Sequence, residues 1–200
     1  MVPWLWLALA MQVKVDLPAL ERACGEEKTA GESCYFLGRA LFVKGEFEAA
    51  RQAFDKAAPS PQLYRGAAMN YVALGRNEDA ERSYRKAIAA GSVDARPDLG
   101  AFLYRQGRMP EALEVLKAAY KTNPNSTRVN LEYGRVLLHA GQAEEAVKRL
   151  EKAVELNPGD ANGHLLLGRA YQRVGRDADA ERELALGATE WRKKQPAGSR

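Results

Sequence analysis

A glycine recurs along most of the chain, in steps of 30, 32, 34 and 34 residues, at Gly45, Gly75, Gly107, Gly141 and Gly175. The residues at fixed distances from each glycine share their size. Alanine follows five residues later in every repeat, a large apolar residue nine later and a small residue twelve later, and another small residue stands seven before. This self-similarity predicts about five stacked copies of one structural unit.

Each repeated position has a physical reason. The glycine marks a point where one helix ends and the chain reverses, because such a turn often needs a positive φ angle. The small residues let two antiparallel helices approach closely, and the large residue, Phe54 in the first repeat, is expected to fill the space between adjacent repeats. Pro124 and Pro158 end the second helices of their repeats. Helix starts are predicted at N-cap residues, which are Ser60, Ser126, Asp160 and Asp177.

Ala, Leu, Glu, Arg and Lys dominate the segments between these markers, and these residues favour helices. We therefore predict an all-α fold with helix pairs at about 32–43 and 46–57, 61–74 and 77–90, 95–106 and 109–121, 126–140 and 143–156, and 160–174 and 177–193. A short helix at about 17–24 lies in a capping segment of residues 11–30. The repeats span residues 31–190 as one cooperative array, and a basic tail of residues 191–200 ends in a loose segment, 195–200.

The pattern resembles the tetratricopeptide repeat over about residues 31–190. The segments Leu99–Leu103 and Leu167–Tyr171 are similar to the family's Leu-Gly-x-x-Tyr motif. The second-helix landmarks of the family are matched by Ala146, Leu150, Ala153 and Pro158. The resemblance implies helix-turn-helix repeats stacked in a right-handed superhelical solenoid. The first two repeats are four and two residues shorter than the later ones, and the fifth lacks the terminal proline, so its last helix is expected to continue past Trp191.

Two cysteines lie near the start of the array. Cys24 ends a helical segment and Cys34 opens the next one, so the two can face each other across a short connection. Their spacing is similar to that of cysteine-bridged relatives of this repeat in secreted bacterial proteins. We therefore expect a disulfide that staples the exposed end of the array, which would need an oxidising compartment. The alternative is two free thiols at packing positions.

The first ten residues are apolar and end in Ala8-Leu9-Ala10, a pattern typical of a signal-peptidase site. Residues 1–10 are therefore interpreted as a signal peptide, and the protein as periplasmic or secreted, although no Lys or Arg precedes the apolar run. The alternative is an amphipathic helix that covers the first repeat of a cytoplasmic protein. The run is too short to span a membrane, and no other segment reaches the ~20 apolar residues that a spanning helix needs.

The sequence offers little for catalysis. Two cysteines and two histidines are too few for a zinc site of several ligands, and no glycine-rich phosphate loop or nucleophile motif is present. His139 and His164 lie on different repeats and are interpreted as packing or surface residues. The net charge of +4 resides in the last ten residues, so it does not indicate nucleic-acid binding. We expect no enzymatic activity, no metal and no cofactor.

The resemblance implies that the first helix of each pair lines a concave surface, and this surface is the candidate binding groove. Its candidate residues are Tyr35, Phe36, Arg39, Arg65, Met69, Tyr104, Arg105, Arg128, Arg135, Arg169 and Arg173. The groove positions together carry seven arginines, no lysine and four acids, Glu32, Asp94, Asp98 and Glu132. Arginine binds carboxylates and stacks on rings, so the groove suits an extended or helical peptide with acidic and apolar side chains. The Lys/Asn clamp with which some family members hold a peptide's C-terminal carboxylate is absent.

These observations predict a non-catalytic scaffold that binds a protein or peptide partner, in the bacterial cell envelope. A cytoplasmic adaptor is the alternative. A nucleic-acid-binding protein is a weaker interpretation, because Asp94, Asp98 and Glu132 interrupt the row of arginines. Self-association through the exposed last helix is a further alternative.

Overall fold

The computed structural model describes residues 16–26 and 30–194, and within them every regular element is an α-helix. Residues 1–10, interpreted above as a signal peptide, and the tail residues 195–200 lie outside the described residues. The chain forms two compact units, residues 1–92 and 93–200.

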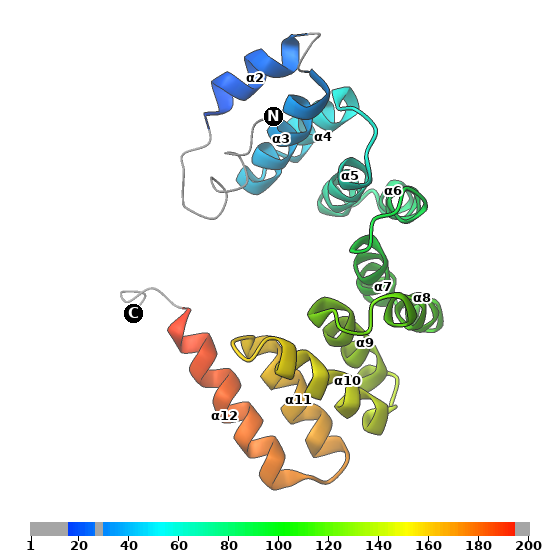
Figure 1. Cartoon of the computed structure of the whole chain (residues 1–200), viewed down its shortest axis with the longest axis vertical. Coiled ribbons are helices and arrows are strands. Elements are labelled where there is room, and N and C mark those ends of the chain that lie inside the picture. Colours follow the sequence, from blue (N-terminus) through cyan, green and yellow to red (C-terminus); the bar gives the residue numbers. More distant parts are fainter. Residues whose placement is uncertain (1–15, 27–29, 195–200) are drawn as a thin grey trace. The chain divides into compact units, whose positions relative to one another are not determined.

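Each unit is a series of antiparallel helices (Figure 1). Unit 1 contains α2 (Leu17–Gly25), α3 (Ala30–Lys44), α4 (Phe47–Lys56), α5 (Pro61–Ala73) and α6 (Asn77–Ala89). Unit 2 contains α7 (Ala95–Arg105), α8 (Met109–Thr122), α9 (Thr127–His139), α10 (Ala143–Leu156), α11 (Ala161–Arg173) and α12 (Asp177–Lys193). These helices begin and end within two residues of the predicted bounds, and α12 continues past Trp191 as expected.

The five repeated glycines form the turns between the two helices of each pair. All five have positive φ angles, for example 77° at Gly141. There the N–H of Gly141 donates to the carbonyl of Leu138 and the N–H of Gln142 donates to that of Leu137. This pattern satisfies carbonyls that the end of a helix leaves without partners, which explains why glycine is needed at this point.

Within a hairpin, a small residue of the first helix faces the large residue of the second. A Cβ atom added to Gly134 would lie 2.6 Å from the side chain of Leu150, and one added to Gly168 would lie 2.7 Å from that of Leu184. The large residue therefore packs inside its own hairpin and also reaches the next repeat as expected, because Leu150 belongs to a buried cluster with Leu166 and Leu167 of α11. Phe54 does both, since it also lies against Gly66 of the next hairpin.

The first helices of successive hairpins contact one another inside each unit. In unit 2, α7 packs against α9 and α9 against α11, and in unit 1, α3 packs against α5. Among the described residues, no comparable contacts join α4 to α6, α8 to α10 or α10 to α12. The first helices therefore form the inner side of each unit, as the resemblance implied.

Three of the four predicted N-caps are confirmed. The side chains of Ser60, Ser126 and Asp160 accept hydrogen bonds from backbone N–H groups in the first turns of α5, α9 and α11. The prediction for Asp177 was wrong, because Asp177 is the first residue of α12 and Arg176 is the cap. After the tight turn at Gly175 the helix begins at Asp177 itself, so Arg176 takes the cap position and pairs with Asp179 at 2.6 Å.

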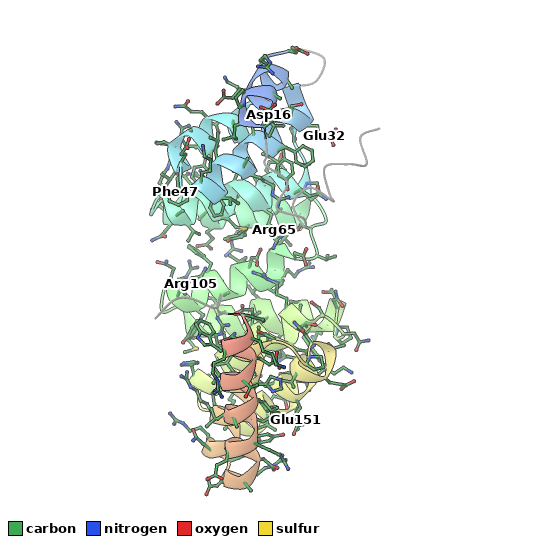
Figure 2. The ribbon with its side chains drawn as sticks, turned by 90° about the vertical axis from the view of Figure 1, so that its left-hand side faces the viewer. Asp16, Glu32, Phe47, Arg65, Arg105 and Glu151 are labelled. Carbon is green, nitrogen blue, oxygen red and sulfur yellow. A yellow bond between two sulfur atoms is a disulfide. The ribbon has the colours of Figure 1, made fainter. Side chains whose placement is uncertain are left out.

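The predicted disulfide is present and joins α2 to α3. Cys24 and Cys34 are bonded, with their Cα atoms 4.6 Å apart, and both are buried. They belong to the core of unit 1 with Leu37, Leu41 and Phe54, and Leu17 and Leu20 of α2 pack against this core. Asp16, labelled in Figure 2, caps α2 by accepting a hydrogen bond from the N–H of Ala19. The bridge and the cap thus fix α2 as a cover on the first hairpin.

In the part of the chain that the structure describes, no helix combines the length and the apolar character that crossing a membrane requires.

Candidate functional site

In unit 1, the candidate residues come from α3 and α5 and are mostly aromatic or apolar. The ring of Tyr35 lies 5.4 Å from that of Phe36, and the guanidinium of Arg39 lies 5.9 Å from the centre of the Tyr35 ring. All three side chains are half-buried. On α5, Arg65 (Figure 2) is half-buried and Met69 is exposed. This face offers apolar contact area with two guanidinium groups beside it.

In unit 2, the candidate residues come from α7, α9 and α11 and are dominated by arginine. Tyr104 of α7 lies 5.2 Å from the ring of His139 of α9, measured between ring centres. The ring nitrogen Nδ1 of His139 donates to the carbonyl of Arg135, because that oxygen can only accept. The contact between the rings of Tyr104 and His139 joins two first helices, α7 and α9.

Two acids on this face of unit 2 are buried, which the sequence did not reveal. Asp98 of α7 is 3% exposed and forms an ion pair with Arg128 of α9, and Glu132 is 8% exposed and lies 3.3 Å from Arg135. The arginine side chains are more accessible, at 48% for Arg128 and 26% for Arg135. Two of the seven arginines are therefore already paired, and the groups nearest to solvent are their guanidiniums.

Burial raises the pKa of Glu132 above its usual value, because a desolvated carboxylate loses favourable hydration. The positive charges of Arg135, Arg128 and Arg105 oppose this effect, and the negative charge of Asp98 adds to it. Burial has the larger effect on the Glu132 carboxyl group, so the arginines compensate its charge only in part.

The remaining candidate arginines of unit 2 are accessible and have no ion-pair partner among the described residues. Arg105 (Figure 2), Arg169 and Arg173 are exposed, and within the described ranges no ion pair joins any of them to another residue. In contrast, every arginine of α4, α6 and α10 pairs with an acid of its own helix: Arg51, Arg82, Arg85 and Arg149. Arg105, Arg169 and Arg173 thus differ from the arginines of α4, α6 and α10, because no acid pairs with them among the described residues.

Other polar contacts in unit 2 involve residues that are not among the candidates. The hydroxyl of Tyr171 donates to Glu151 (Figure 2) at 2.7 Å, and Arg176 lies over the Tyr171 ring. Burial and this hydrogen bond raise the pKa of Tyr171 to about 12, so the hydroxyl remains a donor at neutral pH. His164 is buried, as its interpretation as a packing residue requires. In the described part of the chain, no group of three or more His, Cys, Asp or Glu side chains could hold a metal ion.

Comparison with solved structures gives the same architecture. A structure of YrrB, described as a TPR protein with an unusual peptide-binding site, is 24% identical, covers 89% of this chain and 95% of its own, and has a TM-score of 0.63. PilF of Pseudomonas aeruginosa is 23% identical, with 86% and 78% covered and a TM-score of 0.73. MamA of Desulfovibrio magneticus is 20% identical, with 81% and 95% covered and a TM-score of 0.66. At these identities the likeness shows the fold alone.

A search of curated protein sequences gave no match. Family models agree with the repeats throughout the array. One tetratricopeptide repeat model matches residues 17–64 and 65–127, a second matches residues 103–152, and a third, described as a TPR repeat, matches residues 134–175. The first of these alone spans more than half of the chain. The chain therefore belongs to the tetratricopeptide repeat family.

Proposed function

We propose that this protein is a non-catalytic scaffold that binds a protein or peptide through the faces of its first helices. The observation that carries the proposal is the contrast between the two sets of arginines. Those of α4, α6 and α10 are held by acids of their own helices, whereas Arg105, Arg169 and Arg173 of the inner helices of unit 2 are exposed and pair with no acid in the part of the chain that the structure describes. A free guanidinium offers a planar set of donors to a carboxylate.

The chemistry of the faces supports a partner with acidic and apolar side chains. In unit 2, arginines dominate and the acids Asp98 and Glu132 are buried, so the accessible charge is positive. In unit 1, Tyr35, Phe36 and Met69 offer apolar contact. Family membership adds support, since YrrB, which has the same fold, is described as having a peptide-binding site.

We further propose that the scaffold works in the bacterial cell envelope. The Cys24–Cys34 bridge supports this location, because structural disulfides persist in oxidising compartments and are rare in the cytosol. The apolar residues 1–10 add support from the sequence. A cytoplasmic adaptor is the competing proposal.

The binding proposal is tested by affinity capture from bacterial extract, with the oxidised wild-type protein and two charge-reversal variants as bait. One variant carries Arg169→Glu and Arg173→Glu on α11, and the control carries Lys117→Glu and Lys121→Glu on α8. The two are matched, because all four side chains are exposed and each pair includes one residue in the last turn of its helix.

We expect the α11 variant to lose at least about tenfold in partner recovery, which corresponds to about 1.4 kcal/mol of binding free energy, and the α8 variant to retain it. Circular dichroism should show the same helicity for all three proteins. Equal recovery by all three baits would remove the first-helix face of unit 2 from the proposal.

A further inference from the structure

Glu132 has an unusual environment within the candidate face of unit 2. It is 8% exposed, its oxygen Oε2 lies 3.3 Å from Arg135, and that oxygen accepts no hydrogen bond within the described residues. A buried carboxylate with one long ion pair recovers little of the hydration that it has lost. The pair is therefore poorly stabilised by comparison with a carboxylate that receives full hydrogen bonding.

The charges around Glu132 come mainly from two helices. Asp98 and Arg105 of α7 and Arg128 and Arg135 of α9 have the largest effects on its carboxyl group. Arg128 is already paired with Asp98. The packed helices α8, α10 and α11 contribute no charge of comparable effect. Arg135 is therefore the guanidinium in contact with Glu132 that an incoming anionic group can pair with, and Arg105 adds positive charge to its surroundings.

We propose that Arg135 forms a binding subsite for a carboxylate group of the partner, and that Glu132 occupies this subsite in the free protein. The inference rests on the proposed function and specifies one contact of it. When an acidic side chain of the partner pairs with Arg135, Glu132 is left buried without its ion pair. It then takes up one proton from solvent, because a neutral buried carboxyl group costs far less than an unpaired carboxylate.

The direction of the pH dependence follows from this competition. Protonation of Glu132 releases Arg135, so the affinity for an acidic ligand rises as the pH falls. Burial already raises the pKa of Glu132 in the free protein, which brings the protonation closer to neutral pH. Binding of an anion to Arg135 raises that pKa further.

The chain contains an internal comparison. Arg169 of α11 stands six residues before its loop glycine, as Arg135 does before Gly141. At the offset of Glu132, nine residues before the glycine, α11 carries the buried Leu166. Arg169 therefore has no carboxylate at the position that Glu132 has relative to Arg135. We expect its affinity for an acidic group not to rise through protonation of a neighbouring acid as the pH falls.

The test uses a fluorescein-labelled, acetylated and amidated hexaglutamate peptide as the probe, with binding followed by fluorescence anisotropy at about pH 5.5 and about pH 7.5. The proteins are the wild type, Glu132→Gln, Arg135→Gln and His139→Gln, each checked for helicity by circular dichroism. Glu132→Gln mimics the protonated residue. The carboxyl groups of the probe titrate in the same way in every mixture. The pH dependence seen with Glu132→Gln therefore measures the contribution of the probe.

We expect the wild type to bind more weakly at the higher pH, because release of Arg135 requires a proton on Glu132. The affinity should fall by at most about tenfold per pH unit, which is the limit when binding takes up one proton. Glu132→Gln should bind at least as tightly as the wild type and lose this extra dependence on pH. Arg135→Gln should bind weakly at both values, and His139→Gln should keep the extra dependence on pH that the wild type shows.

Wild-type pH dependence that persists in Glu132→Gln, or that disappears in His139→Gln instead, would overturn the inference. So would a failure of Glu132→Gln to bind the probe, since Arg135 is released in that variant. In each case the extract capture with the α11 variant decides the proposed function separately, because it depends on Arg169 and Arg173.

Discussion

At the scale of single residues, His164 shows how a buried polar group can join three elements of unit 2. Its Nδ1 lies 2.6 Å from Oε2 of Glu183 on α12, and its Nε2 lies 2.8 Å from the carbonyl of Pro158 in the loop before α11. A carbonyl accepts and an ionised carboxylate accepts, so both ring nitrogens donate only when the imidazole is protonated. Burial disfavours the charged ring, but the hydrogen bonds to Glu183 and Pro158 outweigh it and raise the pKa of His164.

The raised pKa of His164 predicts a loss of stability as the pH increases. The stabilisation by the protonated ring is fully present below the pKa of an unfolded histidine, about 6.5, and is lost as the pH rises through the higher folded value. The control is His164→Asn, because Asn130 at the same offset in α9 donates to the carbonyl of Pro124 without titrating. Urea unfolding from about pH 5.5 to about pH 9 gives the free energy of unfolding of both proteins. The difference in favour of the wild type over His164→Asn should become smaller as the pH rises. An advantage that stays constant over this range would contradict the protonated ring.

At the scale of helices, the hairpins depend on close approach at glycine. In an exposed helix interior, Gly→Ala stabilises by about 1 kcal/mol because alanine restricts the unfolded chain and favours the helix. At Gly134 we expect the opposite effect, so that alanine destabilises the protein. The new Cβ would lie 2.6 Å from Leu150, which is fully buried among the side chains of α9, α10 and α11.

We expect Gly134→Ala to lower the free energy of unfolding by about 1–3 kcal/mol, as overpacking does in other cores. Gly163→Ala in α11 is the matched control, because its Cβ would meet Val154 at an ordinary 3.4 Å. That variant should be neutral or more stable by up to about 1 kcal/mol. Thermal and urea unfolding measure both changes, and equal effects of the two substitutions would disprove the packing role assigned to Gly134.

The repeat pattern predicted the helices accurately because each hairpin is fixed by local chemistry. A glycine with positive φ ends the first helix, and Ser60, Ser126 and Asp160 begin the helices that follow the longer loops. These determinants lie within a few residues of the boundary they set. Asp177 failed as a cap because the choice between neighbouring residues depends on how tightly the preceding turn closes.

The pairing of charges on the first helices could not be predicted from the sequence. The offsets placed Asp98, Glu132, Arg128 and Arg135 on one face, and that placement is consistent with the ion pairs that the structure shows. Burial of the two acids depends on the stacking of α7 on α9, and the Asp98–Arg128 pair joins residues of different hairpins. A count of charges by position does not report how accessible each residue is, so it could not show that Asp98 and Glu132 are buried.

At the scale of the molecule, the two units present different chemistry on their inner helices. Unit 1 offers Tyr35, Phe36 and Met69, and its open end is covered by α2 through the Cys24–Cys34 bridge. Unit 2 offers exposed arginines that pair with no acid among the described residues, and a buried acid that pairs with one further guanidinium. A terminal repeat lacks one neighbour, so a covalent staple at that end compensates for contacts that the array cannot make.

The compartment in which the protein folds decides whether the Cys24–Cys34 disulfide forms. One measurement of intact mass tests both export and the disulfide. The full chain is expressed in a bacterial host and alkylated without reduction, and its intact mass is recorded. We expect loss of residues 1–10 and no alkyl adduct, because a cleaved signal leads to an oxidising compartment and the bridged thiols cannot react. A reduced and denatured sample should carry two adducts, which shows that both cysteines are otherwise reactive. A mass that retains Met1 and carries two adducts without reduction would contradict export, and the partner would then be sought in the cytoplasm.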